Sequence, residues 1–235
     1  VRPGPSFSTA LLAVSLEGRV TTTAPCRDVD ASRLSCYYQV TVTGSYSQHA
    51  LLDGIATRTT SFSVFPGSVN PTGSSSSGAA LTVATAGVTA QFAVRARDEF
   101  TNPLSVGGAP YSATLGGTIG GRQQVVVASV TDLDTGSYLV NYTATVAGIY
   151  SIYLVLFNIN AAGAPFADLL VQPGPVSAAR STVWGGGLFG GLLGQALTFA
   201  IQPRDRFDNL VPPGGPLFNV SVSPAWNLER PLQVE

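Results

Sequence analysis

The chain has 235 residues, of which only 11% are charged, and its 12 basic and 13 acidic residues give a formal net charge of −1. These charges are scattered, which argues against a nucleic-acid interface and against a polybasic patch for membranes. The 26 Gly and 16 Pro residues favour short strands joined by turns. Two long uncharged stretches, 143–167 and 184–202, are interrupted by glycine, so we expect no membrane span.

Two cysteines stand near the beginning of the chain. Cys26 and Cys36 are separated by nine residues and could close a local loop through a disulfide, as in extracellular proteins. A pair of unreactive thiols is the alternative. Asn141 and Asn219 each begin an N-glycosylation sequon, which also favours an extracellular protein, although motifs this short often occur by chance.

An internal repeat is the strongest signal in the sequence. The stretch from Phe92 to Asn102 returns 107 positions later, from Phe199 to Asn209, with its Asp, Phe and Asn in the same places. Such a constant offset is typical of repeated domains. Pro-Gly dipeptides that open the copies set the predicted boundaries. The repeats are the C-terminal part of one unit at 1–65, a complete unit at 66–172 and the N-terminal part of another at 173–235, and we expect the chain to be a fragment of a longer protein.

Alternation of apolar residues predicts the strands of the complete repeat. They are a weaker first strand at 81–84, followed by 92–96, 111–115, 125–129, 138–142, 150–156 and 166–171. On the fourth of these strands the alternation groups Val125, Val127 and Ser129 on one face. Seven short strands without a helical period predict an all-β fold of tandem immunoglobulin-like β-sandwich repeats, about 107 residues each.

Several motifs of the complete repeat, taken in order, resemble filamin-type repeats. The matching residues are Gly78 to Leu81, Phe92 and Val94 with Asp98 and Asn102, Gly107-Gly108, Asp134 to Tyr138, Gly148 to Ile152 and Gly163 to Phe166. Leu133 and Thr135 depart from the pattern, because small or amide residues are more usual in that turn. The resemblance implies a module that serves as spacer, adhesive or scaffold, so it specifies the fold more closely than the function.

The resemblance also implies a site for an extended peptide beside the third strand, 110–115, in a groove shared with the fourth, 124–130. Main-chain hydrogen bonds would supply affinity and side-chain pockets would supply specificity. Neither strand carries a charge, although exposed edges are normally protected by charge, proline or cover. The predicted partner-binding edge consists of Tyr111, Ala113, Leu115, Val125 and Val127. Its partners would be other proteins or neighbouring repeats, and cover by a neighbouring repeat is the equal alternative.

The sequence offers little for catalysis. His49 is the single histidine, and no motif places a serine and an aspartate beside it. Two cysteines and one histidine are too few for a structural zinc site, and the glycine-rich stretch 184–194 lacks the Gly-Lys-Ser/Thr of a phosphate loop. Asp98, Asn102, Asp132 and Asp134 are interpreted as turn-capping residues rather than as calcium ligands. We therefore expect no enzyme activity, metal or cofactor.

These observations favour a non-enzymatic structural or adhesion module of a larger multidomain protein, extracellular or at the cell surface. It would act through protein contacts and as a spacer, within a larger assembly. The alternative is an intracellular cytoskeletal or ciliary scaffold, in which the cysteines stay reduced and the sequons are chance. A weaker alternative is an accessory domain of an enzyme.

Overall fold

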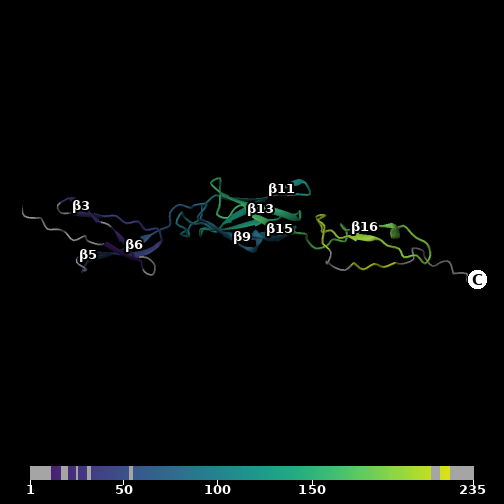
Figure 1. Ribbon diagram of the computed structural model, residues 1–235, viewed down its shortest axis with the longest axis horizontal. Coiled ribbons are helices and arrows are strands. Elements are labelled where there is room, and N and C mark those ends of the chain that lie inside the picture. Colours follow the sequence, from purple (N-terminus) through teal and green to yellow (C-terminus); the bar gives the residue numbers. More distant parts are fainter. Residues whose placement is uncertain are drawn as a thin grey trace, which may run out of the picture. The chain divides into compact units, whose positions relative to one another are not determined.

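The computed structural model describes residues 12–16, 21–24, 26–30, 33–52, 55–212 and 218–222. These residues form β-strands and two single-turn 3-10 helices, with no α-helix among them (Figure 1). The all-β prediction is confirmed. The chain divides into two compact units, Val1–Gln172 and Pro173–Glu235.

The strands before residue 66 form one sheet and one hairpin. The sheet contains β1 (Leu12–Leu16), β2 (Thr21–Ala24), β5 (Gly44–Leu52) and β6 (Ile55–Val64) in the order β2-β1-β5-β6, and the hairpin joins β3 (Cys26–Asp30) to β4 (Arg33–Cys36). Tyr46 on β5 is buried, and its ring stacks on Phe62 with the ring centroids 5.5 Å apart. Its hydroxyl donates a hydrogen bond to the carbonyl of Val42, which fixes the turn that leads into β5.

The complete repeat contains nine strands and one 3-10 turn. They are β7 (Ser75–Ser77), η1 (Ala79–Leu81), β8 (Val83–Thr85), β9 (Ala90–Arg95), β10 (Tyr111–Ile119), β11 (Arg122–Asp132), β12 (Ser137–Tyr142), β13 (Gly148–Leu156), β14 (Ile159–Asn160) and β15 (Phe166–Gln172). The predicted weak first strand at 81–84 is therefore part 3-10 turn and part β8. The strand order is β7-β9-β12-β11-β10-β13-β15-β8, and β14 pairs with β13.

Strand β11 folds this path into two layers. Its first part, from Arg122 to Ala128, pairs with β10, whereas its last part, from Ser129 to Asp132, pairs with β12. One layer therefore contains β7, β9 and β12, and the other contains β10, β13, β15 and β8. Aromatic rings meet between the layers, since the Tyr111 and Tyr138 centroids lie 4.8 Å apart. This arrangement is the predicted immunoglobulin-like fold.

The alternating apolar residues of both layers fill the core. Phe92, Leu115, Tyr138, Ile152 and Leu154 are all at least 99% buried. Buried tyrosine hydroxyls need partners, and the fold supplies them. The Tyr142 hydroxyl donates to the carbonyl of Ala80, and the burial of this side chain raises its pKa to about 12.

The residues grouped on one face of the fourth predicted strand do share a face, but this face points to solvent and not to the core. Val125, Val127 and Ser129 are exposed, and the half-buried or buried positions of β11 are Gln124, Val126, Ala128, Val130 and Asp132. Both sets are mostly apolar, so alternation could not distinguish them. A strand that crosses between layers is covered on its inner face only.

The described part of the second unit contains elements that resemble the beginning of the complete repeat. Strands β16 (Thr182–Trp184) and β17 (Ala200–Gln202) pair, and the 3-10 turn η2 (Gly186–Leu188) stands 107 positions after η1. The described residues 218–222 are not in a strand, although the offset from β10 predicts one there. That residues 1–65 and 173–235 are parts of further repeats stays a prediction.

Candidate functional site

The predicted edge at the third strand does not exist. Strand β10 pairs with β11 on one side and with β13 on the other, and Tyr111, Ala113 and Leu115 are buried. Their main-chain groups are already used within the sheet, so they cannot receive an added strand. The prediction failed because β11 extends far enough to cover β10, which local sequence cannot show.

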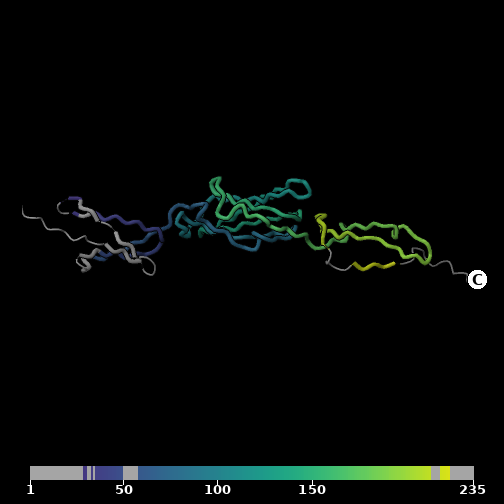
Figure 2. The backbone as a smooth tube through the Cα atoms, viewed as in Figure 1, coloured from purple at the N-terminus to yellow at the C-terminus, as the bar shows by residue number. Residues whose placement is uncertain are grey.

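The edge lies instead on β11. Between Arg122 and Ala128 this strand pairs with β10 only, and its other side faces no described strand. Val125 and Val127 are 65% and 77% exposed. The β10–β11 hairpin stands out from the body of the repeat in the backbone trace (Figure 2). Two of the five predicted edge residues therefore lie at an accessible edge, while binding at this edge stays a prediction.

The edge continues into an exposed apolar surface on the outside of the same layer. We call this surface the apolar face; it consists of Val83, Val125, Val127, Ile149, Tyr153 and Leu170, each more than 40% exposed. Strand register brings these residues together. Val127 and Tyr153 flank Thr114 on β10, and Ile149 pairs with Leu170, which pairs with Val83. None of these six residues is charged.

The outer face of the other layer is polar. Asn141 of β12 lies there, half-buried, between β11 and β9, and its Oδ1 accepts a hydrogen bond from Gln91 Nε2 at 2.8 Å. Arg95 donates to Ser137 Oγ on the same pair of strands. The sequon at Asn141 is thus on the face opposite the apolar face, and Asn219 is exposed in the second unit.

The two cysteines lie directly across from each other. In the β3–β4 hairpin, Cys26 and Cys36 are antiparallel partners in the backbone register. Opposed residues of antiparallel strands have Cα separations of about 4.5 to 5.5 Å, which is within the range of disulfides. A disulfide between them stays a prediction that this register favours.

A buried carboxylate organises the loop after β9. Asp98 is 2% exposed, and its Oδ1 accepts hydrogen bonds from the backbone N–H groups of Phe100 at 3.0 Å and Asn102 at 2.8 Å. Its Oδ2 accepts from the Asn102 side-chain amide at 2.9 Å and from the backbone N–H of Gly67 at 3.0 Å. The interpretation of Asp98 as a turn-capping residue is confirmed, and the carboxylate also fixes the start of the repeat.

Hydrogen bonding controls the charge of this carboxyl group. Burial by itself raises the pKa of Asp98, but the donated bonds from Asn102, Gly67 and Phe100 outweigh burial and hold the pKa below its ordinary value. Asp98 is therefore an anion at neutral pH, and its charge is needed to satisfy the surrounding donors.

The same loop recurs in the second unit. Asp205 is fully buried, and its carboxylate accepts from the backbone N–H groups of Gly174 at 2.8 Å, Phe207 at 2.8 Å and Asn209 at 3.0 Å. Its pKa is lowered by the same kinds of bond, against the effect of burial. Residues 107 positions apart thus share their geometry as well as their identity.

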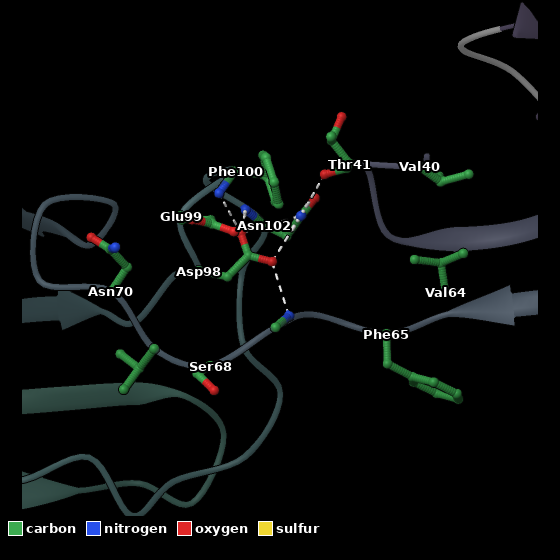
Figure 3. Close-up of a pocket in the computed structure, with 12 residues that line it drawn as sticks. Val40, Thr41, Val64, Phe65, Ser68, Asn70, Asp98, Glu99, Phe100 and Asn102 are labelled. Atoms are coloured by element: carbon green, nitrogen blue, oxygen red, sulfur yellow. Dashed lines mark hydrogen bonds between the residues drawn. The ribbon is translucent and has the colours of Figure 1, made fainter. Parts of the chain in front are cut away.

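Asn102 reaches beyond its own loop, a role that the sequence did not reveal. Its Nδ2 donates to the carbonyl of Thr41 at 2.8 Å, and its Oδ1 accepts from the N–H of Thr43 at 3.1 Å. Figure 3 shows the amide pointing from the Asp98 loop toward Thr41. A pocket of about 480 Å³ opens beside these bonds, with Val40, Val64, Phe65, Val69 and Phe100 among its lining residues.

The other predicted absences concern metal, membrane and catalysis. Among the described residues, no three His, Cys, Asp or Glu side chains are grouped so that they could hold a metal ion, and no helix is long and apolar enough to cross a membrane. Asp132 caps a turn by accepting from the N–H groups of Asp134 and Gly108. His49 contacts Thr59 Oγ1 at 3.0 Å on neighbouring strands.

Known proteins share this fold. The family model of the Filamin/ABP280 repeat matches residues 68–167, which confirms the resemblance for that part of the chain. The solved structure of the Escherichia coli adhesin FdeC is 20% identical, with a TM-score of 0.54 over 89% of this chain and 66% of its own. The Lin-41 filamin domain is 20% identical over 43% of this chain and 92% of its own, with a TM-score of 0.36. InvD of Yersinia pseudotuberculosis is 16% identical over 88% of this chain, with a TM-score of 0.44. This chain spans 66% of FdeC and 63% of InvD, which is less than two thirds of each.

Proposed function

We propose that this chain, in which residues 68–167 match the filamin repeat, is a non-enzymatic structural and adhesive segment of a larger multidomain protein at the cell surface or outside the cell. It acts as a spacer and through contacts with other proteins or neighbouring repeats. The observation that carries the proposal is the uncharged β11 edge, bordered by the apolar face.

The edge provides main-chain groups for a partner. Natural sheets protect exposed edges with charge, proline, bulges or cover, because an unpaired strand recruits other chains. No residue from Gln123 to Ala128, the part of β11 that pairs with β10 only, is charged or a proline. An extended segment could pair with β11 along this stretch, while Val125 and Val127 supply side-chain contacts. The unprotected edge therefore favours a binding role.

The apolar face enlarges the same contact surface. Contiguous exposed apolar surface on a soluble domain commonly marks a site of protein association. The face is continuous with the β11 edge through Val125 and Val127, whereas the opposite outer face is polar and carries Asn141. A glycan at Asn141 would therefore leave the contact surface free.

The extracellular part of the proposal is supported by the cysteine register and by the sequons, of which Asn219 is exposed and Asn141 is half-buried on the polar outer face. A disulfide between Cys26 and Cys36 would close the short β3–β4 hairpin, and Asn219 is exposed. FdeC is described as an adhesin, but the likeness to it concerns the fold, so the adhesive role rests on the edge and the apolar face.

Intact-protein mass spectrometry of the chain isolated from its native source tests the compartment. We expect a gain of two hydrogens on reduction of Cys26 and Cys36, and a loss of mass at Asn141 or Asn219 on glycosidase treatment. Free thiols together with a bare polypeptide mass would favour the intracellular cytoskeletal or ciliary scaffold.

Binding of the labelled chain to intact cells of the same source tests the contact surface. The variant Val125→Glu/Val127→Glu adds two charges at the β11 edge and should abolish binding. The matched control, Ser75→Glu/Ser77→Glu, adds two charges at the same spacing to exposed polar positions of β7 in the other layer and should bind normally. Equal binding by the two variants would reject this surface as the contact site.

A further inference from the structure

The short connection between the first strands and the complete repeat is held by hydrogen bonds from one loop. Asp98 accepts the N–H of Gly67, which follows Pro66 in the connection. Proline has no N–H, so Gly67 supplies the donor of this dipeptide. The Asp98 loop thus fixes the entry of the chain into the repeat.

Asn102 binds the preceding segment in a manner that needs no particular side chain. Its amide donates to the carbonyl of Thr41 and accepts from the N–H of Thr43, so it pairs with this main chain as a neighbouring strand would. The same Nδ2 donates to Asp98 Oδ2, which orients the amide. The buried Asp98 and the bridging Asn102 therefore act as one unit.

The recognised main chain is itself held in place. Val42 lies between the two residues that Asn102 binds, and its carbonyl accepts the hydrogen bond of the buried Tyr46 hydroxyl. The complete repeat has the same arrangement near its β13 strand, where the Tyr150 hydroxyl donates to the carbonyl of Val146 at 2.9 Å. A tyrosine-held turn is thus a feature of both segments.

Apolar packing contributes little to this connection. The walls of the pocket formed by Val40, Val64, Phe65 and their neighbours do not close on each other, and Phe65 remains 80% exposed. Polar bonds from the Asp98 loop join the two segments beside this pocket (Figure 3).

We infer that Asp98 and Asn102 form an orienting joint, in which the Asp98 loop docks on the Thr41–Thr43 main chain and fixes the preceding segment relative to the complete repeat. The joint deepens the spacer role and rests on that part of the proposed function. A stiff joint would set the reach and direction of an array of such repeats.

Nuclear magnetic resonance on the full chain tests the joint. In the unaltered chain, one alignment tensor should fit the residual dipolar couplings of β5 and β13. In Asn102→Ala, separate tensors should be needed, and the protection of the Thr43 N–H from hydrogen exchange should fall about tenfold, as expected for loss of one hydrogen bond. Asn209→Ala makes the same change in the second unit and should leave both readouts unaltered.

A second variant guards against unfolding of the repeat by the first. Thr43→Pro removes the N–H that Asn102 binds and leaves the complete repeat unaltered, so it should also require separate tensors, with the β13 amides still protected. The inference of a joint is contradicted if the unaltered chain already needs two alignment tensors or if one tensor still fits Thr43→Pro. It is also contradicted if Asn209→Ala has the effect of Asn102→Ala. No binding partner or compartment enters these measurements, so they do not depend on the outcome for adhesion.

Discussion

Replacement of Asp98 by alanine should destabilise the complete repeat much more than replacement of an exposed loop residue. The change removes the acceptor for the backbone N–H and for the side-chain amide of Asn102, both in buried hydrogen bonds, and Asp98 itself is 2% exposed. A buried donor without a partner costs about 1 to 3 kcal/mol. With these two buried donors, and with water able to reach the exposed residues Gly67 and Phe100, we expect a loss of about 3 kcal/mol.

Urea unfolding of Asp98→Ala, followed by circular dichroism, measures this loss. The neighbouring variant Glu99→Ala removes the same charge from an exposed side chain and should change the free energy of unfolding by less than about 0.5 kcal/mol. Equal effects of the two variants would refute the assignment of Asp98 as the organising carboxylate.

Acid provides an independent check on the same residue. Because the pKa of Asp98 is lower in the folded chain than its ordinary value, the unfolded chain binds the proton more readily. The stabilisation is fully present above the ordinary pKa and is lost as the pH falls through the lowered, folded pKa. Asp98→Asn should therefore be less stable at neutral pH but should lose less stability than the unaltered chain on acidification. An identical acid dependence would contradict this account.

Three further predictions follow from packing and can be measured by urea or thermal unfolding. Phe92→Ala removes a ring that is 1% exposed and should cost about 3 to 5 kcal/mol, so an unchanged midpoint would contradict the position of β9 in the core. Gly136→Ala should lower the free energy of unfolding by more than about 1 kcal/mol, because φ is +72° and a Cβ would collide with the Leu104 carbonyl. Gly121 has a similar φ of +74° but lies in open space, so Gly121→Ala measures the backbone strain without the collision. Val127→Thr should change the free energy of unfolding by less than about 0.5 kcal/mol, and a larger loss would mean that this side chain is covered.

Much of the fold could be predicted from the sequence because it depends on local alternation. Phe92 and Val94 alternate with more exposed residues on β9, and Tyr138 to Tyr142 do the same on β12, so both strands were found close to their observed limits. The buried face of β11 could not be predicted, because Val125, Val126 and Val127 are equally apolar. Which of these side chains is buried depends only on the layer that packs against the strand.

The error about the edge has a different physical origin. Which strand forms the edge of a sheet depends on how far β11 continues beside β10. The seven residue pairs of β10 with β11, from Ala113 to Ile119, are set by the length of the hairpin and by the point where β11 crosses to β12. Neither property is encoded in the composition of β10 itself. The absence of charge did identify an unprotected edge, but it could not say which of two adjacent uncharged strands forms it.

The role of Asn102 could not be predicted from the sequence. The constant offset from Asp98 and Asn102 to Asp205 and Asn209 marked the loop, and turn chemistry explained Asp98. The partners of the Asn102 amide are main-chain groups of Thr41 and Thr43, which every non-proline residue carries, so no sequence signature for them exists. For the same reason the joint tolerates variation in the segment that it binds. A module that docks on main chain rather than on side chains can be combined with a neighbour of different sequence, provided that a turn like the one held by Tyr46 presents the same two groups.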